Sequence, residues 1–142
     1  MKKMTVLLIV DDDADDREMF ADAINEVDPR LECLVASNGE EAMSMMNSQS
    51  SKIPDLIFLD LNMPRMNGKQ CLAAIKKSKD LQHIPVIIYT TTKRREDEKE
   101  TKQMGAAAFL TKPNSFEGIC RAISLALEER WNELEAAKLD NN

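Results

Sequence analysis

Residues 55–64 decide the fold and read Asp-Leu-Ile-Phe-Leu-Asp-Leu-Asn-Met-Pro. The run Leu56–Leu59 is apolar at every position, which is typical of a strand that is buried on both faces in a parallel sheet. Asp60 follows at the C-terminal end of this strand. Because ligands of open parallel sheets bind beyond the carboxyl ends of the strands, we expect chemistry at Asp60. Pro64 and Gly68 indicate that this carboxylate lies in a constrained loop with a turn.

Composition narrows the class of protein. A chain of 142 residues fits one domain, and its 43% hydrophobic and 31% charged residues are ordinary for a soluble protein. No apolar run approaches the ~20 residues of a membrane span, so we expect a cytoplasmic location and no membrane partner. The three cysteines are far apart, which favours reduced thiols. A net charge of -6 without a basic stripe disfavours nucleic acid as a partner.

Strand and helix patterns alternate along the whole chain. Right-handed crossovers between parallel strands would place helices on both faces of one sheet. The sequence therefore predicts an α/β fold with a doubly wound five-stranded parallel sheet. The expected strands are Met4–Val10, Leu31–Ala36, Leu56–Leu59, Val86–Tyr89 and Ala106–Leu110. The expected helices lie within Asp15–Val27, Asn38–Met46, Cys71–Ile75, Lys93–Met104 and Ile119–Leu127.

Two of these helices carry further local predictions. Asn38 is a suitable N-cap, and Glu41 stands at the capping-box position. The segment Lys93–Met104 is almost wholly charged and has little apolar face. We therefore expect this helix to depend on pairs such as Glu98 with Lys102 and to be the most mobile helix.

Polar side chains follow four of the expected strands. Asp11 and Asp12 end the first strand, Asp60 ends the third, Thr90 ends the fourth and Lys112 follows the fifth. The carboxyl ends of parallel strands open on the same edge, so these side chains should converge. Three close carboxylates repel one another unless a hard divalent cation binds their oxygens, and Mg²⁺ is the natural occupant. A lysine and a threonine hydroxyl beside them would hold a phosphoryl group.

Other polar residues near this edge have simpler interpretations. Asp13, Asp15 and Asp16 stand at a helix start, where acids usually cap the helix or oppose its dipole. We therefore leave them out of the metal site. His83 is the only histidine and precedes Ile84 and Pro85 in a loop, which favours a surface residue over a phosphodonor.

Taken together and in order, these motifs resemble the receiver domains of two-component response regulators, of the single-domain, CheY-like chemotaxis-regulator type. The resemblance covers roughly Thr5–Leu127. It implies a flavodoxin-like sheet with strand order 2-1-3-4-5. The motifs are Val10-Asp11-Asp12, Leu59-Asp60-Leu61-Asn62-Met63-Pro64 with Gly68, Pro85-Val86-Ile87-Ile88-Tyr89-Thr90, Gly105-Ala106 and Lys112-Pro113.

The resemblance also implies a metal site. Asp12 and Asp60 would bind Mg²⁺ together with the backbone carbonyl of Asn62, and Asp11 would act through a bound water.

A set of phosphoryl-binding residues is implied in the same way. Asp60 would be the phosphoacceptor, Thr90 and Lys112 would contact the phosphoryl oxygens, and the Thr91 backbone amide would help. The switch aromatic of the family falls on Phe109, three residues before the lysine. A phenylalanine can swing inward but cannot donate the hydrogen bond of a tyrosine.

The function that follows is phosphotransfer signalling rather than enzyme catalysis. A histidine kinase or a histidine phosphotransfer protein would phosphorylate Asp60, and the altered surface would bind a downstream protein. One alternative is a receiver-like adaptor that binds partners without phosphorylation. Another is an aspartate-nucleophile phosphatase, although such enzymes generally use a second acid where this chain has Asn62.

The chain end gives two further expectations. We assign residues 1–130 to the receiver domain and 131–142 to a helical extension and tail. Beyond Pro113 only 142 − 113 = 29 residues remain, fewer than the ~40 that an independent domain usually needs, so we expect no output domain. Trp131 and Leu134 continue the apolar stripe of the last helix. This continuation suggests a homodimer through the last helix, or packing against the kinase.

Overall fold

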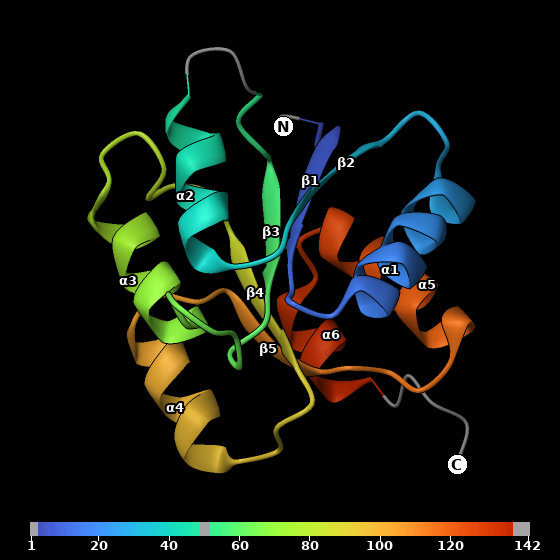
Figure 1. Ribbon diagram of the computed structural model, residues 1–142. Coiled ribbons are helices and arrows are strands. Elements are labelled where there is room, and N and C mark those ends of the chain that lie inside the picture. Colours follow the sequence, from blue (N-terminus) through green and yellow to red (C-terminus); the bar gives the residue numbers. More distant parts are fainter. Residues whose placement is uncertain (1–2, 49–51, 138–142) are drawn as a thin grey trace.

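The computed structural model describes residues 3–48 and 52–137, in which strands and helices alternate as the sequence predicts (Figure 1). Within these residues, no helix is both long and apolar enough to cross a membrane. The elements are β1 (Val6–Val10), α1 (Ala14–Val27), β2 (Glu32–Ala36), α2 (Gly39–Asn47), β3 (Leu56–Leu59), α3 (Gly68–Lys77), β4 (Val86–Thr90), α4 (Arg95–Gln103), β5 (Ala108–Thr111), α5 (Phe116–Leu127) and α6 (Trp131–Ala136).

The five strands form one parallel sheet in the order β2-β1-β3-β4-β5, which confirms the predicted flavodoxin-like topology. Helices α2, α3 and α4 cover one face, and α1, α5 and α6 cover the other (Figure 1). A hydrophobic core lies on each face of the sheet: the first core is on the side of α2 and α3, and the second core is on the side of α1 and α5. From the central strand β3, Ile57 and Leu59 pack in the first core, and Leu56 and Phe58 pack in the second. Both faces of β3 are therefore covered, which is why none of its positions is polar.

Gly68 has a different role from the turn that we expected. It is the first residue of α3, where a Cβ atom would lie 2.2 Å from the backbone oxygen of Asp60. No side chain fits in that gap, so glycine lets α3 begin directly against the loop that carries Asp60. A capping box between Asn67 and Gln70 fixes this helix start.

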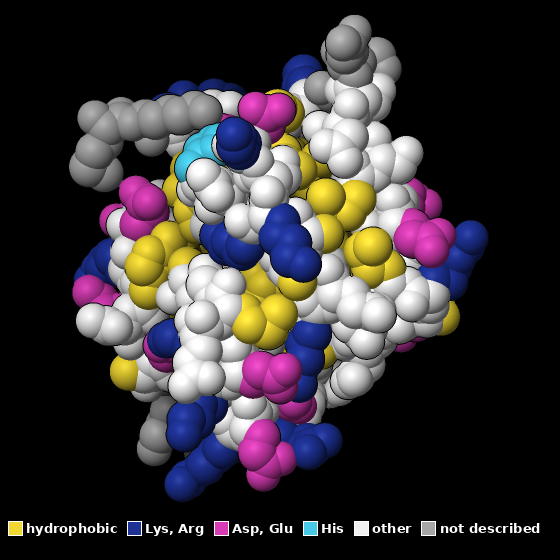
Figure 2. Space-filling view, turned by 90° about the vertical axis from the view of Figure 1, so that its left-hand side faces the viewer, with side chains coloured by type: hydrophobic (Ala, Val, Ile, Leu, Met, Phe, Trp, Pro, Cys, Tyr) yellow, Lys and Arg dark blue, Asp and Glu magenta, His cyan; other side chains and the backbone are white. Residues whose placement is uncertain are grey.

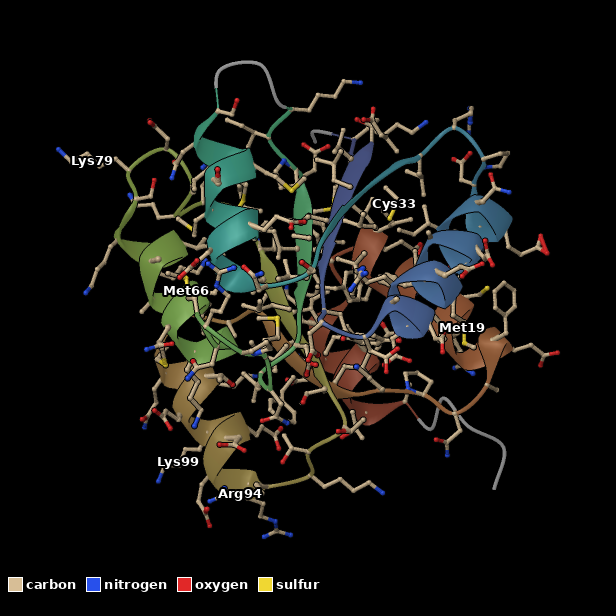
Figure 3. All side chains as sticks on the ribbon, in the orientation of Figure 1. Met19, Cys33, Met66, Lys79, Arg94 and Lys99 are labelled. Carbon is tan, nitrogen blue, oxygen red and sulfur yellow. The ribbon has the colours of Figure 1, made fainter. Side chains whose placement is uncertain are left out.

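The N-terminus of α2 confirms half of its predicted capping box. Asn38 accepts a hydrogen bond from the Glu41 backbone amide at 2.9 Å. The Glu41 carboxylate instead accepts from the backbone amide of Ser37, one residue before the cap. Met66 packs against the first residue of this helix, so that the loop before α3 lies between α2 and α3 (Figure 3).

Helix α4 is as polar as predicted, but its ion pairs differ. Lys102 pairs with Glu135 of α6 at 2.8 Å rather than with Glu98 of its own helix. Among the residues of α4, Thr101 alone is buried. Charged side chains gather over the lower part of the α2–α4 face, where α4 lies, and apolar side chains appear between the helices above it (Figure 2).

The apolar stripe at the chain end does not continue on one helix, and that expectation is wrong. Helix α5 ends at Leu127, and Glu129 takes a positive φ of 56° that turns the chain into α6. Helix α6 packs against β5 and α5, and its Leu134 is fully buried in the second core. The chain thus covers Leu134 itself, and the homodimer stays an untested prediction.

Candidate functional site

Strands β1 and β3 bring three carboxylates together at the carboxyl edge of the sheet. One carboxylate oxygen from each of Asp11, Asp12 and Asp60 lies within 4.8 Å of the others. Asp11 and Asp60 are buried, whereas Asp12 is exposed. The Asp60 backbone amide donates to the Val10 carbonyl at 3.0 Å, so the sheet ladder itself holds the two strand ends in register.

Lys112 projects into this cluster from the loop after β5. Its backbone amide donates to the Thr90 carbonyl at 2.8 Å, which extends the pairing of β5 with β4. Its Nζ atom lies 2.6 Å from Asp11 Oδ2 and 3.6 Å from Asp60 Oδ2. The ring of Tyr89 lies beneath it, with 5.8 Å between Nζ and the ring centroid.

The pKa values of Lys112 and Asp11 are shifted by their surroundings. Burial alone would lower the pKa of Lys112, but the carboxylates of Asp11, Asp16 and Asp60 outweigh it and raise the pKa. Lys112 is therefore a permanent positive charge at physiological pH. Burial raises the pKa of the Asp11 carboxyl above its ordinary value, while Lys112 and the backbone amide of Asp13 oppose this rise.

The chemistry of the cluster suits a hard divalent cation. Asp11 has a buried Oδ2 atom that lies 2.6 Å from the Lys112 ammonium. Together with Asp12 and Asp60 it offers the carboxylate oxygens that such cations prefer. The residues present therefore fit a divalent cation.

The other predicted site residues surround Asp60. Thr90 is fully buried at the end of β4, and its hydroxyl lies 3.5 Å from the backbone amide of Thr92. Thr91, between them, is exposed. The backbone amide of Asn62 lies 3.5 Å from Asp60 Oδ1, and the Asn62 side chain faces solvent. Because β3 and β4 are neighbouring parallel strands, the loops that follow them begin at the same edge of the sheet.

Phe109 lies on β5, beside Ile88 of β4, and its ring is buried in the first core. Its backbone amide donates to Glu135 Oε2 of α6 at 2.8 Å. In this structure the predicted switch aromatic therefore points inward, and α6 contacts the same residue from the open edge of the sheet.

One residue of the site differs from the sequence interpretation. Asp13 caps α1 as expected, because its side chain accepts from the Asp16 backbone amide at 3.0 Å, and Asp15 is exposed. The carboxylate of Asp16, however, accepts a hydrogen bond from Lys112 Nζ at 2.8 Å. The sequence could have indicated this contact with Lys112, because Asp16 stands in the first turn of a helix that starts at the same sheet edge.

A polar pocket adjoins the site on the α3–α4 side. Its volume is about 220 Å³, and it is open to solvent. Two cationic side chains, two amides and one carboxylate contribute to its lining. The lining residues are Leu61, Asn62, Asn67, Lys69, Arg94 and Asp97.

Comparison with known proteins agrees with this geometry. Residues 7–124 match the family described as the response regulator receiver domain. The response regulator Rcp1 of Synechocystis sp. is 29% identical over 132 residues, which cover 90% of this chain and 89% of Rcp1. The sensor histidine kinase CheAY of Helicobacter pylori is 27% identical over 123 residues, 87% of this chain but only 15% of CheAY.

Solved structures give the same result. The Mn²⁺-bound form of Rcp1 superposes with a TM-score of 0.80 at 30% identity and covers 87% of this chain and 95% of its own. The phosphorylated cyanobacterial phytochrome response regulator RcpA superposes with a TM-score of 0.78 at 26% identity. The match covers 91% of this chain and 94% of the RcpA chain. Receiver domains pair with histidine kinases and are signalling proteins. The chain belongs to the response regulator receiver domain family, and its pocket of Asp11, Asp12 and Asp60 is suited to accept a phosphoryl group.

Proposed function

We propose that this chain is a response regulator whose Asp60 accepts a phosphoryl group from the phosphohistidine of a sensor histidine kinase or a histidine phosphotransfer protein. The observation that carries this proposal is the convergence at one sheet edge of Asp60, the buried Thr90 hydroxyl and the Lys112 ammonium with two further carboxylates. A cytoplasmic location, typical of receivers, goes with it.

The transfer needs a nucleophile and compensation for negative charge. A carboxylate oxygen of Asp60 forms a bond to phosphorus while the bond from phosphorus to the imidazole nitrogen breaks, and the imidazole keeps that electron pair. Lys112 and Thr90 contact the phosphoryl oxygens as a charge and a hydrogen-bond donor. A Mg²⁺ ion held by Asp12, Asp60 and the Asn62 carbonyl, with Asp11 acting through water, would neutralise further negative charge.

The output is a change of surface that a downstream protein recognises. Thr90 follows the phosphoryl group, the Thr91 amide assists it, and Phe109 acts as the switch aromatic. Water later cleaves the acyl phosphate and resets the protein. The competing adaptor function would leave all of these residues without a phosphoryl group to bind.

Phosphorylation by a small donor tests this function directly. Incubation with acetyl phosphate and Mg²⁺ should add one base-labile phosphoryl group, measured by intact mass, and Asp60→Asn should take none. Asp80→Asn is the matched control, because Asp80 is an exposed acid in the α3–β4 loop. If the unaltered protein stays unmodified, or if Asp60→Asn is modified as well, the phosphoacceptor role of Asp60 is wrong.

Metal binding is tested separately. Millimolar Mg²⁺ should raise the melting temperature by mass action, beryllium fluoride should raise it further, and Asp12→Ala should abolish both effects. An unchanged melting curve with Mg²⁺ would contradict the metal site.

A further inference from the structure

Lys112 is shared between the acid cluster and a carboxylate outside it. Its contact with Asp16 Oδ2, at 2.8 Å, has the geometry of a hydrogen bond. Its contact with Asp11 Oδ2 is shorter still, at 2.6 Å. Its contact with Asp60 Oδ2 is the longest, at 3.6 Å. The ammonium therefore lies between Asp11 and Asp16 and farther from Asp60.

This orientation matters because an ammonium and a metal ion compete for the same oxygens. A lysine that also donated to Asp60 would have to give up that bond before a cation could bind this carboxylate. A carboxylate on α1 that takes the directed bond of Lys112 removes part of this competition.

The helix turn that carries Asp16 is held in place by hydrogen bonds. The backbone amide of Asp16 donates to Asp13, and Nη1 of the next residue, Arg17, donates to the Asp11 carbonyl at 2.8 Å. The first turn of α1 is thus fixed to the end of β1. The Asp16 side chain, which is 40% exposed, extends from this turn to Lys112.

We propose that Asp16 is a positioning residue that holds the Lys112 ammonium toward α1 and so leaves the carboxylate of Asp60 open to a divalent cation. This inference rests on the proposed function, because it assumes that the cluster binds the cation. It assigns to Asp16 a role that acts through Lys112 and requires no contact between Asp16 and the metal.

Calorimetric titration of the full chain with Mg²⁺ tests the proposal. Asp16→Asn should weaken Mg²⁺ binding about three- to tenfold, as expected when a partly exposed charge-assisted hydrogen bond becomes a neutral one. Asp15→Asn removes the same charge from an exposed neighbour and should change the affinity less than about twofold. Asp16→Glu keeps the carboxylate and should restore affinity to within about twofold.

A double-mutant cycle separates positioning from long-range charge. In a Lys112→Ala background, Asp16→Asn should have no larger effect than Asp15→Asn, because the residue that Asp16 positions is gone. Equal effects of Asp15→Asn and Asp16→Asn, or an Asp16→Asn effect that persists without Lys112, would overturn the proposal. Melting curves without metal verify that each variant is folded. An unaltered protein that binds no Mg²⁺ would instead overturn the metal site of the proposed function.

Discussion

Helices α4 and α5 precede and follow the same strand, β5, but different forces hold them. Helix α5 buries six residues and forms much of the second core, whereas α4 buries only Thr101. Ion pairs hold α4 instead: Lys69 of α3 binds Asp97 and Glu100, each at 2.7 Å, and Lys102 binds Glu135 of α6.

The difference separates a fixed part of the molecule from an adjustable one. Removing α5 from the sheet would expose apolar side chains worth ~1.5–3 kcal/mol each, so it stays in place while the fold exists. The partly exposed ion pairs of α4 contribute roughly 0–1 kcal/mol each and can be exchanged for water. Helix α4 follows Thr90 and precedes Phe109, so the switch under the proposed function would act on a helix of low local stability.

The largest expected effect comes from breaking the core contact of α5. Ile123→Ala should lower the free energy of unfolding by ~2–5 kcal/mol, because it leaves a cavity at a fully buried position. The neighbouring Ser124 is exposed, so Ser124→Ala should change the free energy of unfolding by less than about 0.5 kcal/mol. Urea unfolding measures both. A cost for Ile123→Ala as small as that of Ser124→Ala would mean that α5 is not anchored by its core.

A smaller effect is expected at Glu135 of α6, which contacts both α4 and β5. Glu135 accepts from the Phe109 amide and from Lys102, so Glu135→Ala removes an ion pair and the partner of a strand N–H group. We expect a loss of ~1–2 kcal/mol. Glu135→Gln keeps an acceptor for Phe109 and should cost only about 0.2–1 kcal/mol. Equal costs for both variants would show that the contact with β5 contributes nothing.

The two-sided burial of β3 and the convergence of Asp11, Asp60, Thr90 and Lys112 were predictable from the residues, whereas the order of the strands came from the family resemblance. The first two depend on a local pattern joined to a general rule: uninterrupted apolar runs predict buried parallel strands, and parallel strands end at one edge. Such rules need no knowledge of which individual side chains meet.

The errors concern which side chains meet. Lys112 bonds to Asp16 across 96 positions, and Lys102 bonds to Glu135 across 33, whereas the sequence argument for Lys102 considered only a neighbour on the same helix. The break after Leu127 was missed because Trp131 and Leu134 keep a helical spacing. Nothing in that spacing reveals that Glu129 adopts a positive φ.

A further expected effect is confined to α4 itself. Lys69→Met keeps most of the side chain but removes the charge that pairs with Asp97 and Glu100. Global stability should fall by less than ~1 kcal/mol, while amide exchange within α4 should become about three- to tenfold faster. Lys99→Met is the control, because Lys99 projects from α4 away from the sheet (Figure 3). Equal exchange rates in the two variants would mean that Lys69 does not hold α4.

The smallest effect is a shift of one pKa. A hydrogen bond from Lys69 holds the pKa of Asp97 below its ordinary value of 3.8, with help from the charges of Lys69 and Arg94. Since the folded pKa is depressed, this pair stabilises α4 fully above pH 3.8, and the contribution is lost as the pH falls through the folded pKa. In Lys69→Met the pKa of Asp97 should rise toward 3.8, and in Lys99→Met it should not change. Carbon-detected NMR titration of the Asp97 carboxyl reads this shift directly. If its pKa stays depressed without Lys69, another group holds Asp97, and the contrast between a core-anchored α5 and a Lys69-anchored α4 would need a different source of charge.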